Sequence, residues 1–110
     1  MAGAIEDAIN VHKTEVVFYD KVNECHYRLN SSNMKKVIFD YVLIKKLFGL
    51  KKEYAERIII NTSDPDIPED LIVCEIHESN FHRFRGGFRT FVDENRIPLE
   101  IYDINGQLQN

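Results

Sequence analysis

Residues 77–96 read HESNFHRFRGGFRTFVDENR, and the periodicity of this stretch organises the rest of the chain. Four phenylalanines recur in it at intervals of three, four and three residues: Phe81, Phe84, Phe88 and Phe91. On a helix, which advances about 100° per residue, these rings form one apolar stripe. Burying each ring is worth about 1.5–3 kcal/mol, so the stripe predicts a long helix that anchors the core.

Gly86 and Gly87 lie in the middle of this predicted helix. Each glycine costs about 0.5–1 kcal/mol relative to alanine inside a helix, because the backbone loses more conformational freedom. Two interpretations account for the pair. Either the glycines admit a backbone or a ligand closely, or they divide the segment into two short pieces with one glycine in the left-handed conformation.

A basic flank runs beside the apolar stripe on the same helical projection. Its members fall within an arc of about 60°: His82, Arg85, Arg89 and Arg96. Arginine suits phosphate because its planar fork donates two parallel hydrogen bonds and also stacks on aromatic faces. Each of these arginines could instead lay its stem over the core and keep its charge in water. However, residues 81–92 contain three arginines and no acid, so we predict that the flank binds nucleic acid.

Lysines and acids are separated along the chain, whose net charge is −4. Residues 34–52 contain six lysines in three adjacent pairs against one acid, and residues 53–76 contain seven acids against one arginine. If the lysine-rich segment lies beside the arginine flank, the two form one phosphate-attracting face, with Lys51 and Lys52 extending the track. The alternative is that the paired lysines only keep the protein soluble.

The 110 residues and 44% hydrophobic content fit a single domain over residues 1–110. Residues 1–12 are expected to be flexible or to form a short helix. They lack the basic and apolar regions of a signal peptide, and no stretch reaches the ~20 apolar residues of a membrane span. We therefore expect a cytoplasmic protein, in which Cys25 and Cys74 are reduced thiols.

The remaining chain predicts strands, because short segments rich in Val, Ile, Phe and Tyr alternate with turn residues. They cover residues 14–19, 24–29, 34–48, 57–61, 71–76 and 99–104. Residues 34–48 fit both a helix and a strand, and the density of β-branched and aromatic residues favours the strand. About six strands and one long helix predict an α+β fold, a small and mostly antiparallel β-barrel whose helix covers an open end or edge.

The sequence contains no catalytic constellation. His77 and His82 are five residues apart, whereas two histidines on one helix need a spacing of four to share a zinc ion. Cys74 and His77 have the spacing of two zinc ligands, but the sequence contains no Cys-x-x-Cys pair that would complete a zinc site. The acidic residues of 64–70 lack the glycine and the terminal glutamate spacing of a calcium loop. We expect a non-catalytic protein with no metal, no cofactor and no small-molecule substrate.

Residues 15–20, EVVFYD, leading into residues 23–29, NECHYRL, together with residues 81–103, resemble the PrgU-like family of small proteins. This family occurs on enterococcal pheromone-responsive conjugative plasmids. The resemblance covers about residues 14–104 and rests on size and overall sequence character. It implies a PUA-like β-barrel and a regulatory role that limits toxic overproduction of plasmid-encoded surface adhesins and conjugation proteins by binding RNA.

The leading hypothesis is therefore an RNA-binding regulator in which Arg85, Arg89 and Arg96 contact phosphates. His82 would contribute by stacking or when protonated. A second hypothesis is a protein-interaction module, whose Phe/Arg surface meets an acidic partner or a second copy in a homodimer. A third is a small enzyme assembled from dispersed residues, such as Tyr19, His26 and Glu75.

Overall fold

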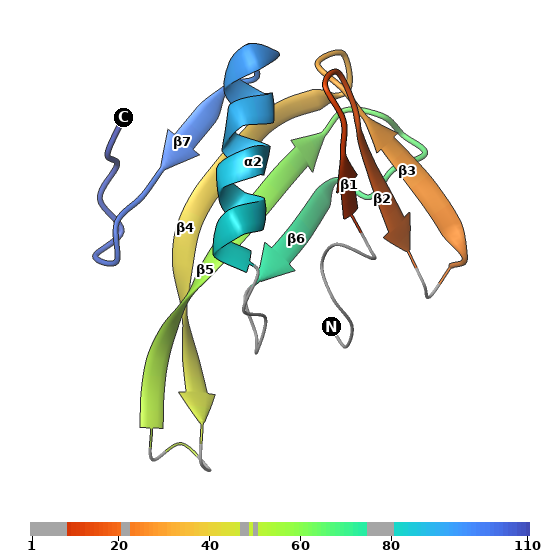
Figure 1. Ribbon diagram of the computed structural model, residues 1–110. Helices are drawn as coiled ribbons and strands as arrows, with labels where there is room; N and C mark the ends of the chain where they lie inside the picture. Colours follow the sequence, from red (N-terminus) through yellow and green to blue (C-terminus); the bar gives the residue numbers. More distant parts are fainter. Residues whose placement is uncertain (1–8, 21–22, 47–48, 50, 75–80) are drawn as a thin grey trace.

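The computed structural model describes residues 9–20, 23–46, 49, 51–74 and 81–110. The first three strands form an antiparallel sheet in the order β1-β2-β3 (Figure 1). Their bounds are Ile9–Val11 for β1, Val16–Asp20 for β2 and Cys25–Leu29 for β3. Residues 9–11 of the segment expected to be flexible or helical are thus a paired strand, and residues 1–8 lie outside the described chain.

A second sheet contains four strands in the order β6-β5-β4-β7. Their bounds are Met34–Lys46 for β4, Lys51–Thr62 for β5, Asp70–Cys74 for β6 and Leu99–Ile101 for β7. The β4–β5 and β5–β6 pairs are antiparallel, whereas β7 lies parallel to β4. The described residues therefore have an α+β architecture, with mostly antiparallel strands in two open sheets and one helix.

The prediction of a closed barrel is wrong for the strands that the structure describes. The chain passes from β3 to β4 through a tight turn, in which the amide of Met34 donates to the carbonyl of Asn30 at 3.0 Å. From Val37 to Phe39, however, β4 has β5 on one edge and β7 on the other. Because both edges of β4 are occupied, β3 has no partner there and the two sheets remain separate.

Residues 34–46 of the ambiguous segment form β4, so the prediction of a strand is confirmed. Burial along it follows a period of two. Val37 and Phe39 are fully buried, while the alternating residues Ile38 and Asp40 are partly exposed on the other face. A helix would have grouped residues at a period of 3.6, so the β-branched and aromatic content was the better guide here.

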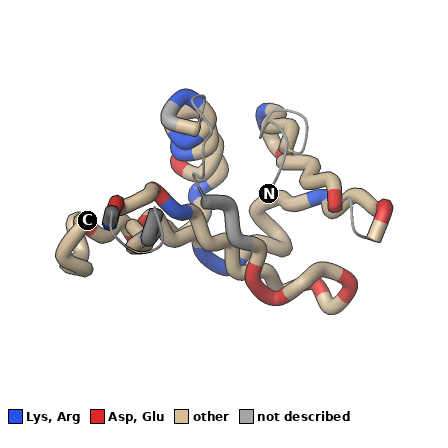
Figure 2. The backbone as a smooth tube through the Cα atoms, turned by 90° about the horizontal axis from the view of Figure 1, so that it is seen from below, with Lys and Arg blue, Asp and Glu red and all other residues tan. Residues whose placement is uncertain are grey.

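The single described helix, α2, spans Phe81–Glu94 and stands on one side of the four-stranded sheet (Figure 2). Phe81, Phe88 and Val92 are fully buried and Phe91 is almost so, whereas Phe84 is half-buried. These side chains share one core cluster with residues of both sheets, including Phe39. The predicted apolar stripe is confirmed.

The C-terminus of α2 closes with a Schellman motif. The amide of Ile97 donates to the carbonyl of Val92 at 3.0 Å, and the amide of Arg96 donates to the carbonyl of Asp93 at 3.2 Å. Arg96 adopts the left-handed conformation that this motif requires, with φ of 55°. Ile97 and Val92 are both buried, which supplies the apolar contact that accompanies the motif. This geometry orients the chain toward β7.

Helix α2 runs through Gly86 and Gly87 without interruption. Neither residue has a positive φ, and a Cβ at either position would meet no neighbouring atom within 4 Å beyond the helix backbone. The division of the helix and the close approach of a backbone are therefore wrong, and the close approach of a ligand stays a prediction. The glycines are ordinary exposed helix positions that lack a side chain.

We expect Gly86→Ala and Gly87→Ala each to raise the free energy of unfolding by about 0.5–1 kcal/mol, because alanine loses less backbone entropy in a helix. Urea denaturation measures this change. Gly106→Ala is the matched control: the same substitution at φ of 81° forces a left-handed alanine and should destabilise the protein by about 1–2 kcal/mol. Destabilisation by either α2 substitution would contradict a continuous, unobstructed helix.

Candidate nucleic-acid interface

Arg85 lies where α2 meets β4. Its guanidinium carbon is 4.6 Å from the centroid of the Phe39 ring, a cation–π arrangement. Phe39 is fully buried and contacts Phe88 of the helix at a ring separation of 6.4 Å. The arginine head is thus held over a rigid core ring, not spread freely into solvent.

The Nε atom of Arg85 is buried and has no hydrogen-bond partner. A buried donor without an acceptor costs about 1–3 kcal/mol, so native structures rarely leave one. No ion pair with Arg85 is found among the described residues. Arg85 therefore carries a positive charge that no carboxylate of the described residues neutralises, and a phosphate that reached its guanidinium would meet no internal competitor.

Arg89 lies one helical turn beyond Arg85. Its Nε is 3.7 Å from Oδ2 of Asp93, and these two side chains are 50% and 60% exposed. An exposed pair of this kind contributes about 0–1 kcal/mol and is screened by salt. Asp93 therefore competes only weakly with a phosphate for Arg89.

Arg96 and His82 complete the predicted flank at the two ends of α2. Arg96 is exposed in the left-handed position just past the helix, and His82 belongs to the first turn, although its side chain lies outside the description. We name Arg85, Arg89 and Arg96 the α2 flank. The structure places Arg85 and Arg89 in adjacent turns, with Arg96 beyond the helix end.

Lys51 and Lys52 begin β5, where the register pairs them with Lys46 and Lys45 of β4. Figure 1 shows this hairpin continuing past the N-terminal end of α2 to a tip far from the helix C-terminus. The expected single track of lysines and arginines is therefore not formed. The two basic groups are separate, because β4 and β5 are longer than the strands that flank them.

Arg83 is a basic residue that the helical projection did not select. It is exposed on the other side of α2, where it lines a shallow groove with Val11 of β1 and Phe84. Its position about 120° from Arg89 on the helix means that the charge of α2 is divided between two sides. Counting all three arginines of residues 81–92 would have indicated this division.

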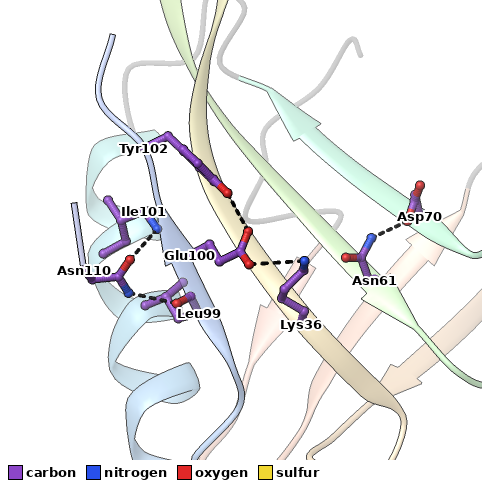
Figure 3. Close-up of polar contacts among 8 residues, drawn as sticks. All are labelled: Lys36, Asn61, Asp70, Leu99, Glu100, Ile101, Tyr102 and Asn110. Atoms are coloured by element: carbon purple, nitrogen blue, oxygen red, sulfur yellow. Dashed lines mark hydrogen bonds and ion pairs between the residues drawn. The ribbon is translucent and has the colours of Figure 1, made fainter. Parts of the chain in front are cut away.

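The sheet face opposite α2 carries paired charges (Figure 3). The carboxylate of Glu100 accepts hydrogen bonds from the Tyr102 hydroxyl at 2.7 Å and from Lys36 Nζ at 3.3 Å. The hydrogen bond from Tyr102 lowers the pKa of Glu100 most, and the bond from Lys36 lowers it further. The hydrogen bond between Tyr102 and Glu100 also raises the pKa of Tyr102. Arg57 donates two bonds to Asp40, at 2.8 and 2.6 Å. Lys36 and Arg57 on this face are therefore already paired with carboxylates.

Figure 3 also shows how the outer edge of β7 is occupied. The side-chain amide of Asn110 accepts from the amide of Ile101 at 2.9 Å and donates to the carbonyl of Leu99 at 2.8 Å. The amide of Gln109 donates to the carbonyl of Ile101 at 2.7 Å. The C-terminal residues thus satisfy the backbone groups of β7 that face away from β4.

A polar cluster lies on the β2–β3 hairpin, where the Tyr27 hydroxyl donates to Asp20 Oδ2 at 2.9 Å. Hydrogen bonding to the Cys25 side chain, then to Asp20, together with burial, raises the pKa of Tyr27 to about 12. On the same hairpin the rings of Tyr19 and His26 lie 4.9 Å apart. Glu75, the third residue of the enzyme hypothesis, lies outside the described residues, so that grouping stays a hypothesis.

Among the described residues, no group of three His, Cys, Asp or Glu side chains could hold a metal ion. No helix of this part has the length and apolar character needed to cross a bilayer. Cys74 is the end of β6, and its side chain is not described.

Comparison with known proteins finds no family model, no curated protein and no solved structure that matches this chain. The likeness to the PrgU-like family therefore stays a prediction from sequence character. The class that the structure itself defines is a small α+β protein with two open sheets and one helix.

The raised pKa of Tyr27 has a consequence for stability. The unfolded pKa is 10.0 and the folded pKa is about 12, so the stabilisation is complete below pH 10 and is lost as pH rises from 10 to 12. We expect Tyr27→Phe to unfold with a shallower alkaline loss of stability than the wild type, measured by urea denaturation across this pH range. Identical slopes for the two proteins would contradict the hydrogen-bonded geometry.

Proposed function

We propose that this chain is a non-catalytic, cytoplasmic RNA-binding regulator, and that the α2 flank contacts the phosphates. The observation that carries the proposal is Arg85, whose guanidinium lies over Phe39 with a buried Nε that has no partner. A guanidinium is an efficient phosphate ligand because its donors are planar and fixed. The aromatic ring beneath it holds this fork in one orientation before any ligand arrives.

Arg89 and Arg96 extend the contact along the helix. Arg89 exchanges its weak pair with Asp93 for a phosphate, and Arg96 presents its charge from an exposed turn. Contacts to phosphate are independent of base identity, so they supply affinity and orientation. The mechanism is occupancy of a transcript, and it involves no bond-making step.

The regulatory role comes from the sequence resemblance alone. In the PrgU-like family the expected outcome is a limit on the expression of plasmid-encoded surface adhesins and conjugation proteins. The closed barrel that the same resemblance implies is replaced here by two open sheets. The proposal that adhesins and conjugation proteins are the targets therefore rests on the resemblance, whereas the proposal of phosphate binding rests on Arg85 and its neighbours.

The protein-interaction hypothesis requires the phenylalanines to be available on the surface. Phe81, Phe88 and Phe91 are buried in the core, and only Phe84 is partly exposed. Because interface cores are built from large apolar side chains, a helix that shows mainly arginines is a poor candidate for a homodimer interface. Polyanion binding uses the groups that α2 does expose.

We expect the double variant Arg85→Gln/Arg89→Gln to bind short single-stranded RNA more weakly than the wild type. Removing two phosphate contacts should also make the log–log salt dependence shallower by about 1.4, since each contact to a single strand contributes about 0.7. Fluorescence anisotropy of labelled RNA at several salt concentrations measures both quantities.

The matched control is Arg28→Gln/Lys35→Gln, which removes the same charge from exposed positions on β3 and β4. Arg28 is already paired with Glu15 at 2.8 Å, so this variant should keep most of the affinity and the slope. Equal losses in the two double variants would show that only net charge matters. Unchanged binding in Arg85→Gln/Arg89→Gln would remove the α2 flank from the proposal.

A further inference from the structure

Strands β4 and β5 are the two central strands of the larger sheet, and they extend beyond the outer strands β6 and β7. The last β5 residue paired with β6 is Arg57, and the last β4 residue paired with β7 is Phe39. Beyond these points, among the described strands, residues 41–46 pair only with residues 51–56. We name this two-stranded extension the arm (Figure 1). At about 3.4 Å per residue it projects about 20 Å. Isolated two-stranded hairpins are marginally stable, so core packing alone does not account for its length.

One face of the arm exposes two large side chains. Leu43 and Tyr54 are directly opposite each other in the register and are 41% and 54% exposed. Tyr54 is the only exposed Phe or Tyr side chain in the described part of the chain. A tyrosine on a paired strand has little conformational freedom to lose, which suits it to stacking.

Lysines follow this pair toward the tip. Since residues two apart on a strand share a face, Lys52 lies on the face of Tyr54, and the register pairs Lys52 with Lys45. The next pair is Lys46 and Lys51, and residues 45–52 contain four lysines and no acid. Like charges directly opposite each other destabilise a hairpin, so a bound anion would relieve this repulsion.

We propose that the arm is a second nucleic-acid contact, in which a base of a single strand stacks on Tyr54 while Lys52 holds an adjacent phosphate. This inference rests on the proposed function and adds a site at the opposite end of the molecule from Arg96. Single-stranded nucleic acid offers both of the features that the arm requires. Its bases present flat π-faces and its backbone presents closely spaced negative charges.

Other occupants fit the arm less well. A second copy of the arm would bring four lysines against four lysines, and this repulsion opposes pairing of the tips. An acidic peptide would match the lysines but offers no regular aromatic partner for Tyr54. An anionic membrane would also match the charges, and it is treated as an outcome of the test below.

The chain contains no tryptophan, so Tyr54→Trp introduces a single fluorescent reporter on the arm. We expect short unstructured RNA to quench this tryptophan, because a stacked base lies against the indole. Inorganic polyphosphate, which has the charge without the bases, should compete for binding without quenching. Leu108→Trp is the matched control, since Leu108 is also 54% exposed but lies near the C-terminus, and its emission should not change.

Affinity provides a second readout. Tyr54→Ala should weaken RNA binding by about 5- to 150-fold, the range for loss of one base–aromatic stack, while Tyr54→Phe keeps the ring and the affinity. Lys52→Gln should make the salt dependence shallower by about 0.7. Circular dichroism of each variant confirms that the fold is retained.

The outcomes separate the arm from the α2 flank. If Arg85→Gln/Arg89→Gln loses RNA while Tyr54→Ala binds normally and Tyr54→Trp is not quenched, the arm inference is wrong and the proposed function stands. Quenching in Tyr54→Trp together with unchanged RNA affinity in the α2 double variant supports the arm and overturns the α2 flank. If anionic phosphatidylserine vesicles change the emission and RNA does not, the arm contacts lipid and the inference fails.

Discussion

The packing of Phe88 against Phe39 joins the helix to the four-stranded sheet, and the rest of the structure depends on it. Phe39 is central to β4, between β5 and β7, and Phe88 is central to α2. The same Phe39 ring carries the Arg85 guanidinium. One buried side chain therefore links the stability of the core to the orientation of the cation most suited to a phosphate, and a shift of α2 would displace both.

The distribution of ion pairs distinguishes the faces of the molecule more clearly than the net charge does. On the sheet face away from α2, Asp40 and Glu100 neutralise Arg57 and Lys36. On α2 and the arm, Arg85 and Lys52 have no ion pair among the residues that the structure describes. A chain with an overall charge of −4 can thus present cations locally, because Asp40 and Glu100 are paired and a further group of acids, Asp64, Asp66 and Glu69, lies in the loop between β5 and β6.

Local sequence predicted the helix from its period of 3.6 and β4 from its β-branched and aromatic content, because both signals depend only on neighbouring residues. Closure of the sheets was not predictable in this way. It depends on which strand occupies each edge of β4, and Leu99 of the parallel strand β7 lies 62 positions along the chain from its partner Val37. The candidate site divided for the same reason. The sequence identified Arg85, Arg89 and the lysine pairs, but their separation follows from how far β4 and β5 outgrow their neighbours.

The amide of Asn110, which bonds the outer backbone of β7, has a consequence for self-association. An edge strand with free amides and carbonyls is a template on which another chain can add, and sheet growth of this kind leads toward fibrils. Here a side chain imitates the missing neighbour, so the larger sheet ends at β7 and offers no template there. The protein carries at one end a long hairpin with exposed apolar side chains, and Asn110 protects it from polymerising at the edge of β7.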